Sequence, residues 1–441
     1  MSSDRSDPGL AEASAPHPFR IANFRAYWLS RLSLTLGQYA MLLIIGWQTY
    51  NIARDGGMTV GEASGQLALI GLFQFVPLFL LTPFSGLAAD RLNRRTVARS
   101  MVGLQVLCAA ILCWFTWQEA MALPILYGIS VILGIGRAFA GPALSALAPN
   151  LVPKSVLPNA IALSSIAWQT GMIVGPAIGG YLFEVAPPLP YAAVLVLFSI
   201  SIICLSLIGD VPRSPITGAK RPIGQIVDGM KYVGRNKVVL GSITLDLFAV
   251  FLAGATALFP VYARDILQVG APGLSQLAAA PAVGAALTAL IFSFRPLKTN
   301  VGPRMLFAVA VFAVATIVFG FSKSMPLSLV ALFFVGAADM FSVYIRQSLI
   351  QLHTPDEKRG RVSAVSLVTI SASNEFGDFF SGSLAFLIGP VAAVVTGGAG
   401  ALVITGLWTF FFPALRNART FDPPRELIEE PPEEKLQETI P

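Results

Sequence analysis

The sequence predicts an all-α integral membrane protein, with twelve transmembrane helices arranged as two six-helix bundles and both termini in the cytoplasm. Three observations lead to this prediction: the composition, the number of long apolar segments and the distribution of positive charges. Of the 441 residues, 55% are hydrophobic and 12% are charged, which is about half the charged fraction of a typical soluble domain. Lipid must therefore solvate most of the surface, and we expect a multi-pass protein of the bacterial inner membrane.

Twelve segments reach the length of about twenty apolar residues that a helix needs to cross a bilayer. The first six lie at 27–50, 64–87, 98–118, 122–147, 158–184 and 191–209, and the second six at 238–262, 274–294, 304–322, 326–352, 362–388 and 391–413. The expected domains are therefore two bundles, at 21–210 and 238–413, joined by a cytoplasmic linker at 211–237. Within the linker, residues 223–233 allow a short amphipathic helix on the membrane surface.

The polar ends of the chain and its positive charges indicate the orientation. Residues 1–20 are expected to be a disordered cytoplasmic leader and 414–441 a solvated cytoplasmic tail. With this orientation the outer loops hold only three basic residues, Arg54, Arg264 and Lys323, and the other basic loop residues face the cytoplasm. The net charge of +6 thus reflects membrane topology, and we expect no nucleic-acid partner. Cysteine and histidine spacings predict neither a metal site nor a cofactor.

The two bundles carry the same pattern 202 positions apart. In both copies a helix with one central charge, Arg137 or Asp339, leads through a proline-containing loop into a glycine-bearing helix. Parallel six-helix repeats are typical of transporters whose halves rock about a central site. Aligned glycines are Gly134 with Gly336, Gly175 with Gly377, and Gly180 with Gly382.

A polar motif with several charges follows the second apolar segment. It reads Gly86-Leu-Ala-Ala-Asp90-Arg91-Leu-Asn93-Arg94-Arg95. The glycine permits close approach of the helix end, the aspartate can interact with a neighbouring helix N-terminus, and the arginines can pair with it or with lipid phosphate. The plainer interpretation of the arginines is ordinary positive charge on the cytoplasmic side.

Closely spaced glycines distinguish the fifth apolar segment. Gly171, Gly175 and Gly179 recur every four residues and share one helix face, Pro176 adds a kink, and Gly180 follows. Small residues on one face let a neighbouring helix approach closely. This face is either a static packing surface or a surface that slides during a transport cycle.

Ionisable side chains within apolar segments cost several kcal/mol unless they are paired or hydrated. Glu375 and Asp378 share a helix face and resist ionising together, so one of them is expected to carry a proton. The alternatives are that Arg137 forms a structural ion pair with one acid, and that Glu375 or Asp378 only hydrogen-bonds a neighbouring helix. Arg346 lies two turns from Asp339 on the same stripe, where it can also snorkel to the cytoplasmic mouth. The ionisable residues singled out within the apolar segments are Arg137, Asp246, Asp339, Arg346, Glu375 and Asp378.

These motifs resemble those of one transporter superfamily. The polar motif is similar to the loop 2 to 3 signature of the major facilitator superfamily, with Asn93 replacing a glycine and tolerating positive φ better than most residues. The glycines of the fifth segment resemble the helix 5 motif of that superfamily's exporters. The stretches 345–355, 359–364 and 373–377 resemble the branch of transmembrane secretion effectors, which includes the enterobactin exporter and is near macrolide exporters.

The resemblance implies a cavity lined by helices 1, 4, 7 and 10. It suggests cavity roles for Gln38, Gln48, Arg137, Asp246 and Asp339, with contributions from Gln74 and Gln169. Trp47 and Trp168 either form aromatic walls or pack in the core or against lipid. It also implies that Asp90, Arg91 and Arg94 hold the halves together on the cytoplasmic side when the cavity faces outward.

The expected function is secondary active transport. We expect a monomer that exports amphipathic small molecules, of the drug or siderophore class, by alternating access in exchange for protons. A lysophospholipid or other lipid transporter of the same fold is an alternative, and so is a transport-inactive membrane sensor or scaffold. An enzyme is not expected, because His17 and His353 are too far apart to share a metal and no catalytic motif is present.

Overall fold

The computed structural model describes residues 17–209 and 222–421. The side chains at 83, 85–91, 146, 154, 222–227, 356–357, 364, 367–368, 371–372 and 375 lie outside this description. Throughout the described residues the regular secondary structure is helical, without a strand. The all-α prediction is therefore confirmed.

The first six long helices follow a short turn, η1 (Pro18–Arg20). They are α1 (Ala22–Asp55), α2 (Val60–Arg91), α3 (Arg94–Trp117), α4 (Leu123–Leu147), α5 (Leu157–Val185) and α6 (Leu189–Leu207). The later elements are α7 (Pro222–Arg235), α8 (Lys237–Ala253), η4 (Thr256–Leu258), α9 (Phe259–Val261), η5 (Tyr262–Ile266), α10 (Gly270–Phe294), α11 (Val301–Phe321), α12 (Met325–Leu352), α13 (Asp356–Ile388), α14 (Pro390–Phe411) and α15 (Pro413–Arg416).

The number of spans agrees with the expected twelve. In the described residues, eleven helical stretches are long and apolar enough to cross a membrane. The remaining span is α13, in which Phe376–Ile388 is a shorter apolar stretch of described residues, and serine and threonine are frequent in its first half. The twelve-helix fold is thus confirmed, and α13 is its most polar member.

The seventh span differs from the single helix expected at 238–262. Helix α8 ends before Gly254, whose ψ of 96° takes the backbone out of the helical region. The chain then continues through η4 and α9 into η5, a π-helical turn that ends at Ile266. Single π turns occur often at functional sites, and this one carries the adjacent charges Arg264 and Asp265.

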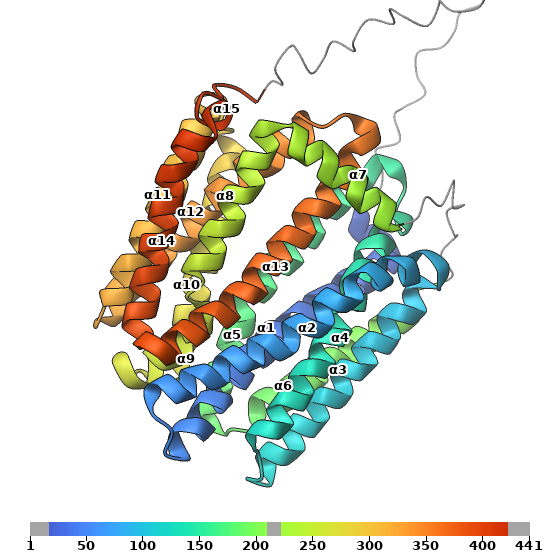
Figure 1. Cartoon of the computed structure of the whole chain (residues 1–441). Coiled ribbons are helices and arrows are strands. Elements are labelled where there is room, and N and C mark those ends of the chain that lie inside the picture. The colour runs from blue at the N-terminus through green and yellow to red at the C-terminus, as the bar shows by residue number, and fades with distance from the viewer. Residues whose placement is uncertain (1–16, 210–221, 422–441) are drawn as a thin grey trace, which may run out of the picture.

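The long helices form two halves, α1–α6 and α8–α14. Within the second half, α13 lies on the side that faces α2, as Figure 1 shows. Helix α7 lies within the segment 211–237 and packs against α13 and α8. The end of α6 lies beside the start of α1, since the Gly209 N–H donates to Asn23 Oδ1 over 3.2 Å. We call the end of the molecule that holds α7 and these chain segments the linker end.

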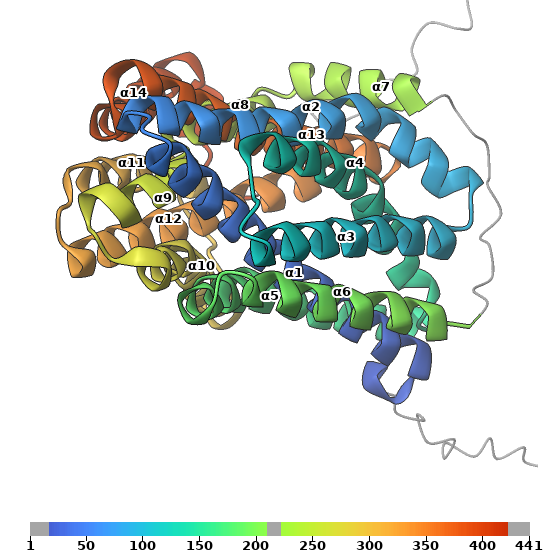
Figure 2. The ribbon, with the colours of Figure 1, turned by 90° about the horizontal axis from the view of Figure 1, so that it is seen from below.

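The two halves meet along two helix pairs, α2 with α13 and α5 with α10, which lie on opposite sides of the molecule in Figure 2. Along the first pair, Gly61 and Gly65 of α2 face Phe386, and Phe75 meets Phe376 at 5.6 Å between ring centroids. These contacts lie in the part of α2 that is far from the linker end. We call this opposite end, which holds the end of α1 and η5, the closed end.

A single apolar cluster of buried side chains joins the halves at the closed end. Trp47 and Tyr50 come from α1, Leu67 comes from α2, and Phe259 and Tyr262 come from the broken seventh span. Between membrane-spanning helices, close van der Waals packing of such side chains is a main source of association energy. This shared core therefore holds the closed end together.

The sequence repeat has a counterpart in the packing. A Cβ at Gly180 of α5 would meet Ala271 of α10, and a Cβ at Gly382 of α13 would meet Ala68 of α2 at 2.8 Å. Both glycines thus let a helix of one half approach a helix of the other half closely. The pattern that repeats at 202 positions corresponds to the two contacts between the halves.

Candidate functional site

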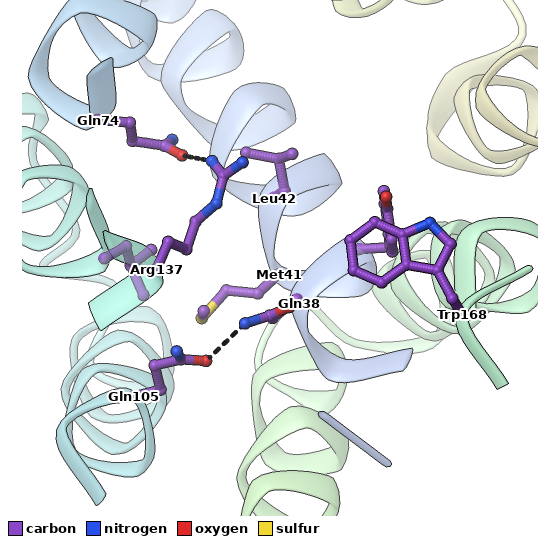
Figure 3. A pocket seen from close by; sticks show the side chains of 9 residues that line it. Gln38, Met41, Leu42, Gln74, Gln105, Arg137 and Trp168 are labelled. Carbon is purple, nitrogen blue, oxygen red and sulfur yellow. Dashed lines mark hydrogen bonds between the residues drawn. The ribbon is translucent and has the colours of Figure 1, made fainter. Parts of the chain in front are cut away.

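A pocket lies midway along the helices of the N-terminal half (Figure 3). It contains about 520 Å³ of empty space, including the open space at its mouth. Four helices contribute most of its polar lining, because each places one long side chain at mid-length. The lining residues are Gln38, Tyr39, Met41, Leu42, Gln74, Gln105, Leu133, Arg137 and Trp168.

The polar groups of the pocket form two hydrogen bonds between helices. Arg137 Nη1 of α4 donates to Gln74 Oε1 of α2 over 3.2 Å, and Gln38 Nε2 of α1 donates to Gln105 Oε1 of α3 over 3.2 Å. Figure 3 shows both bonds on the same side of the pocket. Gln38, Gln74 and Arg137, which the sequence indicated separately, are therefore brought together.

Trp168 supplies an aromatic wall. Its side chain lies across the pocket from the polar groups in Figure 3, and 41% of the residue is exposed. The ring meets Tyr39 edge-on at 5.9 Å between centroids, and the Arg31 guanidinium lies 5.4 Å from the ring centroid. Trp168 therefore combines an open aromatic face with a nearby positive charge.

Three other expected cavity residues lie elsewhere. Gln48 is buried between helices, where it donates to Thr116 Oγ1 over 3.2 Å and accepts from the Tyr191 hydroxyl over 2.7 Å. Trp47 belongs to the shared core of the closed end. Gln169 Nε2 donates to Ala282 O across the two halves over 3.4 Å. Because helix rotation sets which way each side chain points, residues on a cavity helix need not face the cavity.

The C-terminal half contains a buried charge cluster at α8 and α12. Asp246 and Arg346 form an ion pair, with side-chain exposures of only 5% and 2%. Asp339 is half-buried and interacts electrostatically with both residues. The alternative that Arg346 snorkels to the membrane surface is therefore wrong, because a neighbouring helix supplies its counter-charge inside the protein.

Asp378 contacts the broken seventh span. Its Oδ1 accepts a hydrogen bond from Thr256 Oγ1 over 2.6 Å, so α13 is connected to η4. The side chain of Glu375, expected to share a face with Asp378, lies outside the described residues. The proposed pairing of these two carboxylates therefore stays a prediction.

Two ion pairs connect the halves at the closed end, and sequence analysis expected their arginines, Arg54 and Arg264, only as outer-loop charges. Arg54 Nε lies 3.2 Å from Asp265 Oδ2, and Arg264 Nη2 lies 2.5 Å from Asp55 Oδ1. Tyr50 also donates a hydrogen bond to Asp265. We call these contacts the crossed ion pairs, because an Arg-Asp dipeptide on α1 meets a second Arg-Asp dipeptide on η5.

The structure describes only part of the loop motif that follows α2. The side chains of Gly86, Asp90 and Arg91 lie outside it, so their expected gating role stays a prediction, as does that of half-buried Arg94. Asn93 does not adopt the positive φ that the comparison with glycine suggested. Its φ is −67°, and its Oδ1 accepts from Arg95 N over 3.0 Å, so it caps the N-terminus of α3.

The glycines of α5 divide between two neighbours. Gly171, Gly175 and Gly179 face α1 within the same half, where an added Cβ at Gly175 would lie 2.7 Å from Tyr39 Cβ. Gly180 faces α10 of the other half, and Pro176 O accepts from Ser275 Oγ over 2.7 Å. Among the residues of the expected sliding surface, Pro176 and Gly180 are therefore the ones that contact the second half.

Sequence reasoning missed Gln105, Tyr39 and the acidic residue Asp265. Gln105 lies inside the apolar segment 98–118, where a buried amide was a usable signal of a polar site. The repeated Arg-Asp dipeptide was also visible, but only the break after Gly254 brings Arg264 and Asp265 next to α1. That break could not be inferred from hydropathy.

Comparisons with known proteins agree with the twelve-helix transporter fold described above. The family model described as transmembrane secretion effector matches residues 13–439. Enterobactin exporters EntS of Escherichia coli (strain K12) and of Shigella boydii serotype 18 are each 25% identical to the chain over 411 residues, covering 92% of it and 95% of their own length.

Solved structures share the fold at low sequence identity. A D-xylose-proton symporter and a POT family transporter in complex with a thioalcohol conjugated peptide each superpose with a TM-score of 0.70 at 13% identity. Each comparison covers 89% of this chain, and 98% and 96% of the respective transporter. The chain, a multi-pass protein of the bacterial inner membrane, therefore belongs to the transmembrane secretion effector family of major facilitator superfamily transporters.

Proposed function

We propose that the protein exports amphipathic small molecules of the drug or siderophore class by alternating access, in exchange for protons. One observation carries this proposal: the halves are joined at the closed end by a shared core and the crossed ion pairs, while a polar and aromatic pocket lies at mid-depth. A pocket between an end that closes and an end that opens is what alternating access requires. The relationship to exporters supports the outward direction of transport.

The linker end is proposed to face the cytoplasm, with both termini on that side. Short loops rich in lysine and arginine remain inside, and the linker end carries most of the basic residues. The structure would then be the inward-facing state, in which substrate enters the pocket from the cytoplasm. The described basic residues of the linker end include Arg20, Arg25, Arg94, Arg95, Arg99, Lys231, Arg235, Lys237, Arg295, Lys298, Arg304, Lys358, Arg359 and Arg361.

Asp339 is the group that we propose to exchange a proton. It shares a low-dielectric region with Asp246 and Arg346, and one arginine can neutralise only one of two carboxylates. Asp246 is directly paired, so Asp339 is left to bind a proton when the cluster is closed to water. Two states that bind proton and substrate differently couple the two fluxes.

Transport in proteoliposomes tests this proposal, with enterobactin, erythromycin and lysophosphatidylethanolamine as separate probes and a pH-sensitive dye inside. Wild-type protein is expected to accumulate one of the first two against its gradient and to dissipate the pH gradient. Asp339→Asn is expected to abolish accumulation but to retain exchange of labelled for unlabelled probe, because binding and rocking do not need the proton.

The outcomes separate the components of the proposal. Undiminished accumulation by Asp339→Asn would refute its role in proton exchange. Movement of the lysolipid alone would favour a lipid transporter of the same fold, and absence of flux for all three probes in correctly folded protein would count against export. Asp228→Asn, at an exposed ion pair on the linker helix, is the matched control for loss of a carboxylate.

A further inference from the structure

The described C-terminal end of the chain folds back onto the linker end of the second half. After α14 the chain forms α15 and continues to residue 421, and we call residues 413–421 the tail strap. Leu415 is fully buried, and Ala418 and Phe421 pack against the same apolar core, to which α8, α11, α12 and α14 contribute. The tail strap is therefore an integral part of this half.

Two hydrogen bonds and a close backbone approach hold the tail strap at the start of α11. Gly302 N donates to Ala418 O over 3.0 Å, and Arg419 Nη1 donates to Asn300 Oδ1 over 2.8 Å. A Cβ added at Gly302 would overlap the Leu415 carbonyl oxygen. Asn300 has a φ of 52°, in the left-handed region that asparagine adopts more readily than most residues. The loop before α11 is thus shaped to receive the tail strap.

An aromatic stack extends from the tail strap to α10. Phe421 meets Tyr344 of α12 edge-on, at 6.3 Å between ring centroids, and Tyr344 stacks on Phe292 of α10 at 4.4 Å. Phe341, one turn before Tyr344, also contacts Phe292, at 4.9 Å between centroids. The tail strap therefore contacts α12 at the ring against which the linker end of α10 packs.

The sequence repeat gives this stack a particular position. At a shift of 202 residues, Phe292 corresponds to Asp90 of the N-terminal half. The charged loop motif of the first half thus has a phenylalanine at the matching position of the second. Edge-on and offset-stacked rings are the arrangements that aromatic pairs favour. Aromatic contacts, backed by the tail strap, therefore occupy the position that an acid holds in the other copy.

Helix α10 has two parts with different partners. Its closed-end part is joined to α5 by hydrogen bonds of three residues, Ser275, Gln276 and Ala282. In its linker-end part, Phe292 packs on α12 while Leu290 is exposed. Pro281 lies where the first part ends. Because proline lacks an N–H and crowds the preceding turn, a helix bends most easily at this residue.

We infer that the tail strap opposes closure of the linker end. By backing the aromatic stack, it holds the linker-end part of α10 against α12. Closure bends this part at Pro281 toward α5, so that Phe292 leaves Tyr344. The strength of the contacts made by the tail strap therefore sets the fraction of molecules whose linker end is closed. This inference rests on the proposed alternating access and adds a device that regulates it.

Two substitutions should shift this equilibrium in opposite directions. Phe421→Ala removes the edge-on contact with Tyr344 and is expected to raise the ratio of closed to open linker ends by about two- to tenfold. Asn300→Asp gives Arg419 a charged partner in an exposed contact and should lower the ratio, by up to about fivefold. Aspartate tolerates the left-handed backbone at this position. Adding Arg419→Gln should cancel the effect of Asn300→Asp.

Distances between spin labels on Thr96 of α3 and Leu290 of α10 measure the ratio by double electron–electron resonance in proteoliposomes. Both residues are exposed and belong to different halves, and the shorter distance marks the closed linker end. The labels are attached to protein whose native cysteines are replaced by alanine, at Cys108, Cys113 and Cys204. Phe410→Ala removes an exposed phenylalanine of α14 and is the matched control, with an unchanged ratio expected.

Opposite shifts cannot come from a general loss of folding, so Asn300→Asp keeps the test decisive even if Phe421→Ala is unstable. An unchanged ratio in Asn300→Asp, or a shift in the same direction in both variants, would overturn the inference.

The same labels separate this inference from the proposed function. If both distances occur but the tail-strap variants leave their ratio unchanged, alternating access stands and the inference fails. If the variants shift the ratio in opposite directions but none of the transport probes moves, the inference stands and export fails. A single distance in every variant would overturn both.

Discussion

At the scale of single residues, the least expected arrangement is the ion pair between Asp246 and Arg346. Both side chains are almost fully enclosed, at 5% and 2% exposure, and the Arg346 Nε has no hydrogen-bond partner among the described residues. Removing two charges from water costs several kcal/mol per ion, which the attraction offsets only while both partners are present. The pair is therefore sensitive to loss of either member.

Single neutralisations of this pair should be more damaging than a double one. Asp246→Asn removes the directly paired carboxylate of buried Arg346 and leaves Asp339 as the remaining acid of the cluster, so it is expected to cost up to about 3–5 kcal/mol of stability. Asp246→Asn combined with Arg346→Gln removes both charges and should recover most of that loss. Thermal unfolding in detergent ranks the stabilities of the three variants. A double variant less stable than both single variants would contradict the predicted ranking.

Sequence reasoning identified the ionisable residues within the membrane but not all of their partners. Asp246, Asp339 and Arg137 were identified because charge is rare in apolar segments. Their partners depend on how neighbouring helices are rotated, which a hydropathy pattern does not contain. For that reason Gln48 was expected in the cavity although it packs against Thr116 and Tyr191, and Gln105 was not considered.

At the scale of helices, the contact of α5 with α10 is closer than helices with large side chains permit. An added Cβ at Gly180 would overlap the Ala271 carbonyl oxygen and Ser275 Oγ. The serine side chain can rotate away, whereas the backbone carbonyl cannot move without shifting α10. Close approach at this point therefore depends on the absence of a side chain at residue 180.

Gly180→Ala is expected to destabilise the protein by about 1–3 kcal/mol, as overpacking does in other cores. Gly141→Ala is the matched control, because a Cβ at that position of α4 has no neighbour within 4 Å. Alanine is favoured over glycine in a helix by about 0.5–1 kcal/mol, so the control should be neutral or more stable. Thermal unfolding compares the two, and equal effects would show that the contact is unimportant.

Hydropathy predicted the number of spans well and their internal breaks poorly. Apolar length depends on composition, so eleven spans and the apolar part of the twelfth follow from sequence. The end of α8 before Gly254 depends instead on the local backbone and on contact with α13, where an added Cβ would lie 3.5 Å from the Gly377 carbonyl carbon. Such tertiary contacts override the apolar pattern of 238–262.

At the scale of the whole molecule, the crossed ion pairs connect halves that are far apart in the chain. Their side chains are partly exposed, at 27% and 22% for Arg54 and Asp265 and at 28% and 68% for Arg264 and Asp55. Pairs with such exposure contribute about 0.2–1 kcal/mol each. A contribution of this size can shift an equilibrium between two conformations without preventing either.

Reversing one Arg-Asp dipeptide should open the closed end, and reversing both should close it again. Arg54→Asp with Asp55→Arg places like charges opposite each other across the halves. Adding Arg264→Asp with Asp265→Arg restores two opposite-charge pairs without changing the composition. Distances between spin labels on Thr59 and Lys323 are expected to lengthen in the first variant, with a population change on the order of tenfold, and to recover in the second. Unchanged distances in the first variant, or no recovery in the second, would contradict a role of the ion pairs in closure.

The length of α1 has a consequence for the environment in which the crossed ion pairs operate. At about 1.5 Å per residue, its 34 residues extend about 50 Å, well beyond a hydrocarbon layer of about 30 Å. Arg54 and Asp55, at its last turn, are thus outside the lipid and within reach of dissolved ions. Because the Debye length shortens from about 10 Å at 0.1 M salt to about 3 Å at 1 M, the ionic strength of the surrounding medium acts directly on the balance between the closed and open forms.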